Sequence, residues 1–430
     1  MSPMLEPLFI ARQQMAFSMG AHIILACLGV GFPVLMLLAE GLALKKGDAL
    51  WRELARRLSK AFTVLFAAGA ISGTVLSFEL GLFWPAFMAK FGPVIGLPFT
   101  LEAFAFFLES IFLGLYLYGW ERLSPRAHFF CGIPIALAGL ASACFVVCSN
   151  AWMNSPAGFS LDASGKLVGV DAWAAMFNPA SAHEALHMAL AAYIVTGSAV
   201  AAYYAWQRLR GTRSEYNRRA LLLSLGLGCL MAPLQFLSGD RSSMAVARLQ
   251  SVKLAAMEGQ FVTERGAPLR LGGLEIPGML SWMAYGDLQA EVKGLNDVPA
   301  DERPPAMATH LSFQIMVILG SALGLLSLWT AWLAWAQRRK GLKFDEPWHL
   351  GAVLLSGFAS AVALEAGWCV TEIGRQPWIA VGVMRTADAV THAPGLIWVF
   401  AVTLLIYALL GGGVWLSLRH LALIPLKAKP

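Results

Sequence analysis

Long apolar runs separated by short polar segments dominate the hydrophobic pattern of this chain. A membrane-spanning helix needs about 20 mostly apolar residues. Runs of that length lie at about 14–39, 61–84, 98–120, 129–150, 183–206, 219–238, 308–336, 349–371 and 394–418. The pattern therefore predicts an all-α integral membrane protein with about nine transmembrane helices.

Basic residues are concentrated in alternate loops of this arrangement. Most of the 32 Lys and Arg residues fall in the segments 40–60, 121–128, 207–218, 337–348 and 419–430. Short loops rich in Lys and Arg stay on the cytoplasmic side of a membrane. We therefore expect the N-terminus outside and the C-terminus in the cytoplasm.

A single long polar segment interrupts the apolar runs and divides the chain into three parts. We expect helices 1–6 in residues 1–238, a long outer loop in 239–308, and helices 7–9 in 309–430. Loops of this length within compact proteins are usually functional or disordered. The outer loop is therefore the expected place for a soluble binding site.

The composition supports a membrane protein and argues against other classes. Hydrophobic residues make up 58% of the chain and charged residues 13%, whereas a soluble domain carries about 25% charged residues. The net charge of +6 comes from short loops rather than from one soluble face, which argues against nucleic acid as a partner. The six cysteines lie in apolar segments without a CxxC or CxxCH motif, so a zinc ribbon and covalent haem attachment have no support.

Ionisable residues inside the predicted spans are the first candidates for chemistry. His22 lies within the first apolar run, where a metal or proton role is the default for a histidine, with a hydrogen-bonded structural histidine as the alternative. Glu102 and Glu109 are two helical turns apart, so they share one face at a distance of about 10 Å. This pair indicates a proton path or a cofactor contact, and structural pairing is the alternative.

The string His183-Glu184-Ala185-Leu186-His187 matches the HExxH signature of zinc proteases. The signature is short, and no partner motif supplies a third zinc ligand. We favour the interpretation that His187 alone reaches into the bundle and binds haem iron. Met316, near the outer end of the seventh span, is the candidate second ligand, since His/Met ligation is a known low-spin arrangement. Ordinary core packing is the alternative for Met316.

The segment 367–378 places Glu372 and Arg375 three residues apart at the end of a long apolar run. Charged groups at a membrane boundary are costly unless they bind something. In the nine-span arrangement Glu372 falls in the same outer half as the other candidates, which are His22, Glu102, His187 and Met316. One shared layer near the outer surface is what a multi-haem site requires.

Motifs over nearly the whole chain, in order and at compatible spacing, resemble one family. They are Arg12 through His22, Gly96-Leu97-Pro98 through Glu102, Phe106 to Ser110, Asn150 to Pro156, Asn178-Pro179 through His187, Gly239-Asp240, Lys253 to Glu258, Phe313 to Met316, and Glu365 to Trp378. This set is similar to the haem-carrying subunit I of cytochrome bd-type quinol oxidases, including the cyanide-insensitive members with a short outer loop. The Gly-Arg-Gln-Pro-Trp segment is the most specific part of the match.

The resemblance implies a set of iron ligands. His187 and Met316 would be the axial ligands of a low-spin haem b. His22 would ligate one of two high-spin haems and Glu372 would serve the other. One of these would be a high-spin haem b, and the other haem d or a further haem b.

The resemblance also implies roles for residues that do not bind iron. Lys253 and Glu258 would be the quinol-oxidising pair, in which the carboxylate accepts a hydroxyl proton and the ammonium steadies the negative oxygen. Arg375 would pair with haem propionates, because its planar fork suits carboxylates. Trp368 would line the cofactor site.

Two departures from the family pattern concern the proposed sites. Glu102 and Glu109 would line the high-spin site and its proton supply, with Asn150 on a polar path. Their interval is one residue shorter than in better-known members, which rotates the helix face by about 100°. Gln314 stands where the family usually has Arg, and the loss of that cation would change the potential of the low-spin haem.

The function implied is that of a quinol:oxygen oxidoreductase in the bacterial cytoplasmic (inner) membrane. It would oxidise ubiquinol or menaquinol at the outer face, reduce O2 to water, and generate a proton motive force. The expected partners are the multi-span subunit II, a small single-span subunit and the lipid bilayer. The main alternative is a proton-coupled secondary transporter without haem, for which inverted repeats would be expected.

Overall fold

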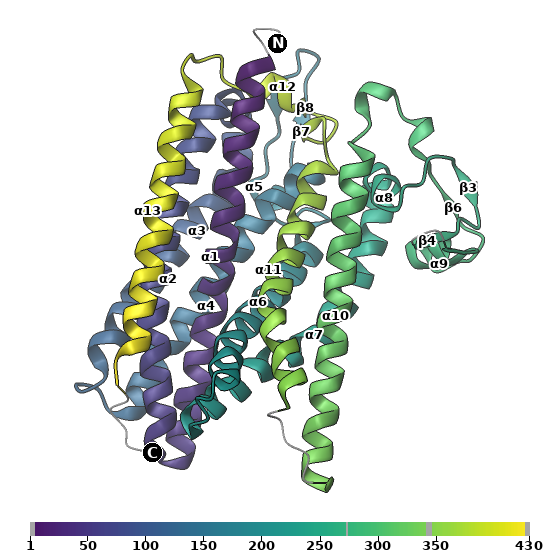
Figure 1. The fold of residues 1–430 in the computed structure, drawn as a ribbon. Coiled ribbons are helices and arrows are strands. Elements are labelled where there is room, and N and C mark those ends of the chain that lie inside the picture. The colour runs from purple at the N-terminus through teal and green to yellow at the C-terminus, as the bar shows by residue number, and fades with distance from the viewer. Residues whose placement is uncertain (1–4, 272–273, 341–345, 426–430) are drawn as a thin grey trace.

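The computed structural model describes residues 5–271, 274–340 and 346–425, so parts of the basic segments 337–348 and 419–430 lie outside it. Nine helices of the described residues are long and apolar enough to cross a membrane, and they stand side by side in one bundle (Figure 1). They are α1 (Leu5–Lys46), α2 (Ala49–Phe83), α3 (Pro85–Gly119), α4 (Pro125–Asn154), α6 (Ser181–Leu209), α7 (Glu215–Leu249), α10 (Ala306–Lys340), α11 (Pro347–Ile373) and α13 (Leu396–Leu423). The predicted nine-span helical fold is confirmed.

Local capping explains where several helices begin. The Asp48 carboxylate accepts a hydrogen bond of 2.9 Å from the Leu50 amide at the start of α2. At the start of α4 the Ser124 hydroxyl accepts one of 3.3 Å from the Ala127 amide, and Pro125 occupies the first helical position. Such caps satisfy backbone N–H groups that have no partner within the helix.

The helices extend further than the apolar runs. The run 219–238 belongs to α7, which continues to Leu249 and carries Asp240 and Arg241 beyond the apolar part. Hydropathy marks only the part of a helix that needs lipid or an apolar core, and it does not mark the helix end. The first residues of the predicted outer loop are therefore helical.

Helix α6 lies at the centre of the part of the bundle that carries most candidate residues. It packs against α1, α4, α7 and α11. Half of its apolar window is buried inside the protein, against 11% for α13. At Gly197 a Cβ atom would lie 2.7 Å from the Gly228 backbone nitrogen, so only glycine allows α6 and α7 to approach this closely.

Short elements connect the long helices and depart from a purely helical description. Between α7 and α10 lie α8 (Ser251–Glu258), β3 (Glu264–Arg265), β4 (Leu269–Leu271), β5 (Leu274–Ile276), α9 (Met279–Tyr285), β6 (Glu291–Val292), η1 (Leu295–Asp297) and η2 (Ala300–Glu302). Strand β3 pairs with β6 and β4 with β5, all antiparallel. Figure 1 places this segment at the same end of the bundle as the start of α1.

Two further connections contain hairpins. Strands β1 (Ser160–Leu161) and β2 (Leu167–Val168), with α5 (Ala172–Met176), join α4 to α6, and β7 (Trp378–Ala380), β8 (Met384–Arg385) and α12 (Thr386–Ala389) join α11 to α13. Helix α12 and its hairpin lie at the same end of the bundle as α8 (Figure 1). The ends of α4 and α11 therefore meet the segment that contains α8.

Candidate functional site

A chain of hydrogen bonds connects α8 to the end of α11 through the end of α4. Lys253 on α8 is 6% exposed, and its Nζ donates to Asn154 Oδ1 at 2.5 Å. Asn154 Nδ2 donates to the Asn150 carbonyl oxygen at 3.0 Å. Asn150 Nδ2 in turn donates to Glu372 Oε1 at 2.5 Å. The structure thus brings together Lys253 and Glu372, which the sequence predicts in two different sites.

Arg375 closes this chain and keeps one donor unused. Its Nη2 donates to Glu372 Oε2, and its Nη1 donates to the Ile379 carbonyl oxygen. The side chain is buried, and its Nε has no hydrogen-bond partner among the described residues. Arg12 lies close by and donates to Gln376 Oε1 at 2.5 Å. A buried guanidinium with a free N–H fits an additional carboxylate, such as a haem propionate.

Glu258 lies at the other end of α8 in a different environment. It is 4% exposed, and its Oε2 has no hydrogen-bond partner in the described part of the chain. Burial raises the pKa of Glu258 to about 7. The five-residue separation places Lys253 and Glu258 about 140° apart around α8. The predicted quinol pair is therefore buried on one short helix, with the two side chains directed to different sides.

The ammonium of Lys253 is influenced by burial and by its neighbours. Burial lowers the pKa of Lys253 below its ordinary range, and the carboxylates of Glu184 and Glu372 oppose this effect. A lysine of this kind keeps its charge only because acidic groups compensate the lost hydration. The Lys253 head group therefore depends on the surrounding cluster.

Helix α2 orients His22, the predicted high-spin ligand on α1. His22 Nδ1 lies 2.8 Å from Ser72 Oγ, and Ser72 Oγ donates its own proton to the Gly69 carbonyl oxygen at 3.0 Å. The hydroxyl must therefore accept from His22 Nδ1–H, which leaves Nε2 as the atom available to a metal. At Gly73 a Cβ atom would lie 3.2 Å from His22 Cε1, so the ring lies directly against the backbone of α2.

Helix α7 faces both histidines of the HExxH string. His187 Nδ1 lies 3.3 Å from Ser238 Oγ, and His183 Nδ1 lies 3.3 Å from Ser242 Oγ. His187 Nε2 lies 2.9 Å from Gln235 Nε2. An amide nitrogen only donates, so Nε2 accepts this hydrogen bond, and its lone pair would be free for iron only once the Gln235 amide turns away.

Met316 on α10 projects toward α11. Its sulfur lies so close to Gly367 that a Cβ atom there would be 2.9 Å from Sδ. Trp368, the next residue on α11, is half-buried. Met316 and His187 lie on helices that both pack against α7 and α11. The glycine therefore leaves room for the thioether at the position where the sequence predicts an iron ligand.

Glu102 and Glu109 both face α4. Glu102 Oε1 accepts a hydrogen bond of 3.3 Å from Ser142 Oγ. A Cβ atom at Gly139 would lie 2.9 Å from Glu109 Oε1. Ser142 and Gly139 are three residues apart, so the two carboxylates lie along one face of the same helix. The shortened interval keeps both glutamates at the α3–α4 contact.

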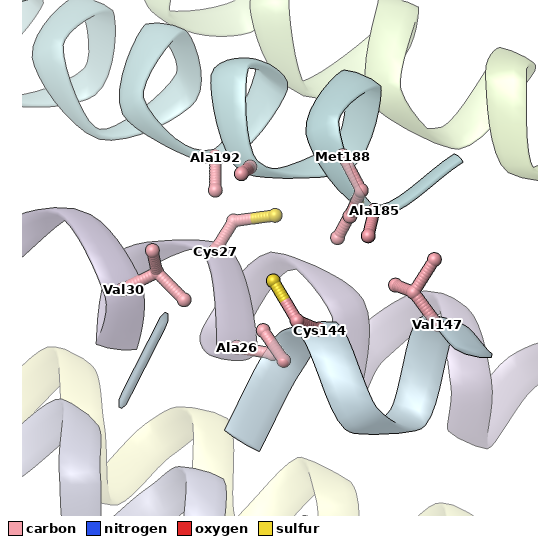
Figure 2. A pocket seen from close by; sticks show the side chains of 10 residues that line it. Ala26, Cys27, Val30, Cys144, Val147, Ala185, Met188 and Ala192 are labelled. Atoms are coloured by element: carbon pink, nitrogen blue, oxygen red, sulfur yellow. The ribbon is translucent and has the colours of Figure 1, made fainter. Parts of the chain in front are cut away.

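A small gap in the packing, lined by none of the predicted iron ligands, lies near the chain positions of His22 and His187. A small apolar pocket lies between α1, α4 and α6, with Cys27 and Cys144 projecting into it (Figure 2). It reaches Met188, the neighbour of His187, and Ala26, one turn after His22. Imidazole, thioether and carboxylate donors, glycines facing the ligands and an unsatisfied guanidinium fit iron porphyrins bound between helices.

The sequence analysis did not single out several residues that the structure places at the site. Ser72, Gln235 and Ser238 act through histidines, and no local pattern marks them. Asn154 was detectable, because it lies four residues after Asn150 on the same helical face, within a motif already recognised.

The fold defines a polytopic helical membrane protein, and its buried imidazole, thioether and carboxylate groups are of the kinds that bind haem iron. Residues 10–424 match the family model described as cytochrome bd terminal oxidase subunit I. The chain belongs to the cytochrome bd terminal oxidase subunit I family, the haem-carrying subunit of bacterial inner-membrane quinol oxidases, which partners with subunit II.

Individual relatives agree with this assignment. A putative cytochrome bd menaquinol oxidase subunit I of Bacillus subtilis is 36% identical over 95% of both chains. A cytochrome bd-II ubiquinol oxidase subunit 1 of Escherichia coli is 28% identical, covering 88% of this chain and 89% of that protein. The solved bd oxidase of Geobacillus thermodenitrificans superposes with a TM-score of 0.90 at 36% identity, covering 96% of this chain and 98% of that chain.

These comparisons confirm the resemblance and leave the alternatives without support. Each of the relatives named above is a subunit of a cytochrome bd quinol oxidase, and the structural match is to a bd oxidase, so these comparisons give the transporter no support. For the zinc protease, the described residues contain no group of three or more His, Cys, Asp or Glu side chains able to hold a metal ion. His183 and His187 instead contact serines of α7.

Proposed function

We propose that this subunit oxidises quinol beside α8 and reduces O2 at a high-spin haem pair between the helices. The observation that carries the proposal is the hydrogen-bonded chain from buried Lys253 through the half-buried Asn150 and Glu372 to buried Arg375. It places the predicted quinol residue within a few side chains of a predicted iron ligand. A short connection between a quinol-binding residue and an iron ligand suits a site that must pass electrons from the quinol to the haems.

The quinol chemistry falls to the two buried groups of α8. Glu258 accepts a hydroxyl proton at its unpartnered oxygen. The Lys253 ammonium stabilises the negative charge that develops on the quinol oxygen. In the complete reaction two quinols and one O2 give two quinones and two waters; the four quinol protons are released on the outer side, and the four protons that enter water are taken up from the cytoplasmic side. That direction follows from the basic loops, which predict the α8 end of the bundle outside.

Iron ligation falls to the donors described above. His187 and Met316 would hold a low-spin haem b. His22 would hold one high-spin haem and Glu372 the other, a haem b together with haem d or a further haem b. When bound, these groups supply one-electron transfer and the place where O2 is reduced. Arg375 would hold propionates, Trp368 would line the cofactor site, and Glu102 and Glu109 would bring protons along α3.

The quinone class and the small partner belong to the same proposal. The Bacillus subtilis relative at 36% identity is named a menaquinol oxidase. A second Bacillus subtilis relative at 29% identity and the Escherichia coli relative at 28% are named ubiquinol oxidases. Menaquinol and ubiquinol carry the same kind of ring hydroxyl groups for Glu258 and Lys253 to bind, so the substrate class is a quinol. A small single-span subunit would complete the assembly beside subunit II.

A reduced-minus-oxidised absorbance spectrum of the complex with subunit II tests the haem assignment. The wild type should show b-type bands, and His187→Ala should lose the low-spin component. His183→Ala is the matched control, since His183 lies one turn away and faces the same helix. A flat spectrum from assembled protein would overturn the proposal. An unchanged low-spin signal in His187→Ala would overturn the ligand assignment.

A further inference from the structure

We propose that Asn154 is a positioning residue of the quinol site, which holds the Lys253 ammonium and links it through Asn150 to Glu372. The inference rests on the proposed role of Lys253. Asn154 is 1% exposed, so water cannot readily replace its hydrogen bonds. It lies at the last residue of α4, where that helix meets α8 and α11.

The chemistry of the donors fixes the direction of the chain. An ammonium only donates, so Asn154 must present Oδ1 to Lys253. Its Nδ2 is then directed to the Asn150 carbonyl oxygen, which only accepts, at 3.0 Å. A carboxylate is also an acceptor, so Asn150 must present Nδ2 to Glu372. Every hydrogen therefore points from Lys253 toward Glu372, and rotating either amide by half a turn would break the chain.

A second contact holds the stem of the same lysine. A Cβ atom at Gly374 would lie 2.9 Å from Lys253 Cγ, so the lysine stem packs on the backbone between Ile373 and Arg375. The head is held by Asn154 and the stem by Gly374, and both lie at the ends of membrane helices. The bond to Asn154 uses one of three ammonium donors, which leaves the others for a quinol oxygen.

This geometry separates a positioning role from a structural one. Asn154→Leu removes the acceptor of a buried cation, and hydrogen bonds to charged groups are strong enough that kcat/KM for quinol should fall about 10- to 100-fold. The loss should appear mainly as a raised KM. Asn154→Asp keeps an acceptor for Lys253 on a stem of the same length but loses the Nδ2 donor to Asn150, so it should recover only part of the affinity that Asn154→Leu loses. Oxygen reduction driven by an artificial one-electron donor, and the haem content, should stay unchanged in both variants.

The experiment compares quinol kinetics of the complex with subunit II for these variants and for Lys253→Met. Ser155→Ala is the matched control, because Ser155 is the next residue and its buried hydroxyl has no partner among the described side chains. The double variant Asn154→Leu with Lys253→Met should lose no more quinol kcat/KM than Lys253→Met alone, since the effects of contacting residues that act as a unit are not additive.

The possible results distinguish the inference from the function on which it rests. If Lys253→Met leaves the quinol KM unchanged, the proposed role of Lys253 fails. If Lys253→Met raises KM and Asn154→Leu does not, only the inference fails. If Asn154→Leu lowers the haem content, the rate of quinol oxidation and the rate of oxygen reduction with the artificial donor together, Asn154 is a structural residue and the positioning role is wrong.

Discussion

Burial of Glu258 predicts a pH dependence of quinol oxidation close to neutrality. The carboxyl group is 4% exposed, and burial raises its pKa to about 7. A general base must be ionised, so activity should appear as pH rises through this value. With a pKa of about 7, the ionised fraction of Glu258 rises from about one tenth at pH 6 to about one half at pH 7, so kcat/KM should rise about fivefold. Above pH 7 the lowered pKa of Lys253 limits any further gain, because its ammonium begins to lose its proton. An exposed glutamate, with a pKa of about 4.3, would give no change over this range.

Initial rates of quinol oxidation by the complex with subunit II, measured across this range, test the prediction. Glu258→Gln should lower kcat by about 10²- to 10⁴-fold, the usual contribution of a positioned base, and should remove the acidic limb. Glu275→Gln is the control, because Glu275 lies in the same loop, is exposed, and forms an ion pair with Arg270 at 3.0 Å. A wild-type profile that is flat between pH 6 and 8, or an acidic limb that persists in Glu258→Gln, would refute the reasoning.

Two further predictions concern the iron ligands. Gly367→Ala places a Cβ atom 2.9 Å from Met316 Sδ, a separation that forces the thioether to move, so the low-spin haem band should weaken or shift. Ser72→Ala removes the acceptor of His22 Nδ1–H, and loss of such a partner typically costs about 10- to 100-fold in metal affinity. Quantitative haem extraction should show reduced high-spin haem with the low-spin haem retained.

Matched substitutions on the same helices control for general damage. Gly351 on α11 has open space around its Cα, so Gly351→Ala should leave the spectrum unchanged. Ser77 on α2 is exposed and donates to the Gly73 carbonyl oxygen within its own helix at 3.1 Å, so Ser77→Ala should keep its haem. If a control variant changes the haem spectrum or content as much as its test variant, the roles assigned to the Gly367–Met316 and Ser72–His22 contacts are wrong.

The membrane spans were predictable from the sequence because each span must satisfy its own backbone hydrogen bonds and be apolar enough for lipid. Both requirements are local to a run of residues. Helix ends were not predictable in the same way: α7 continues to Leu249 through Asp240 and Arg241, where no requirement for apolar side chains remains. The two-stranded sheets β3–β6 and β4–β5 lie in a polar segment, and their strands are too short to show a period-two pattern.

The partners of the site residues depend on tertiary contacts, which a single sequence does not contain. Lys253 and Asn154 are 99 residues apart, and Asn150 and Glu372 are 222 apart. Sequence motifs identified Lys253 and Glu372 as candidates, but only packing of α4 against the ends of α8 and α11 joins them. Ser72 is similar, because its role follows from the position of α2 beside His22 and from a hydroxyl already committed to Gly69.

The carboxylates of buried Glu258 and half-buried Glu372 differ in what surrounds them, and this difference separates their chemistry. Glu372 accepts hydrogen bonds at both oxygens, from Asn150 and from Arg375. A group held on both sides keeps one orientation, which suits a fixed ligand. Glu258 has an oxygen without any partner among the described residues, and its pKa near 7 lets it change protonation during turnover. Only the second environment suits a group that must accept and release a proton in each catalytic cycle.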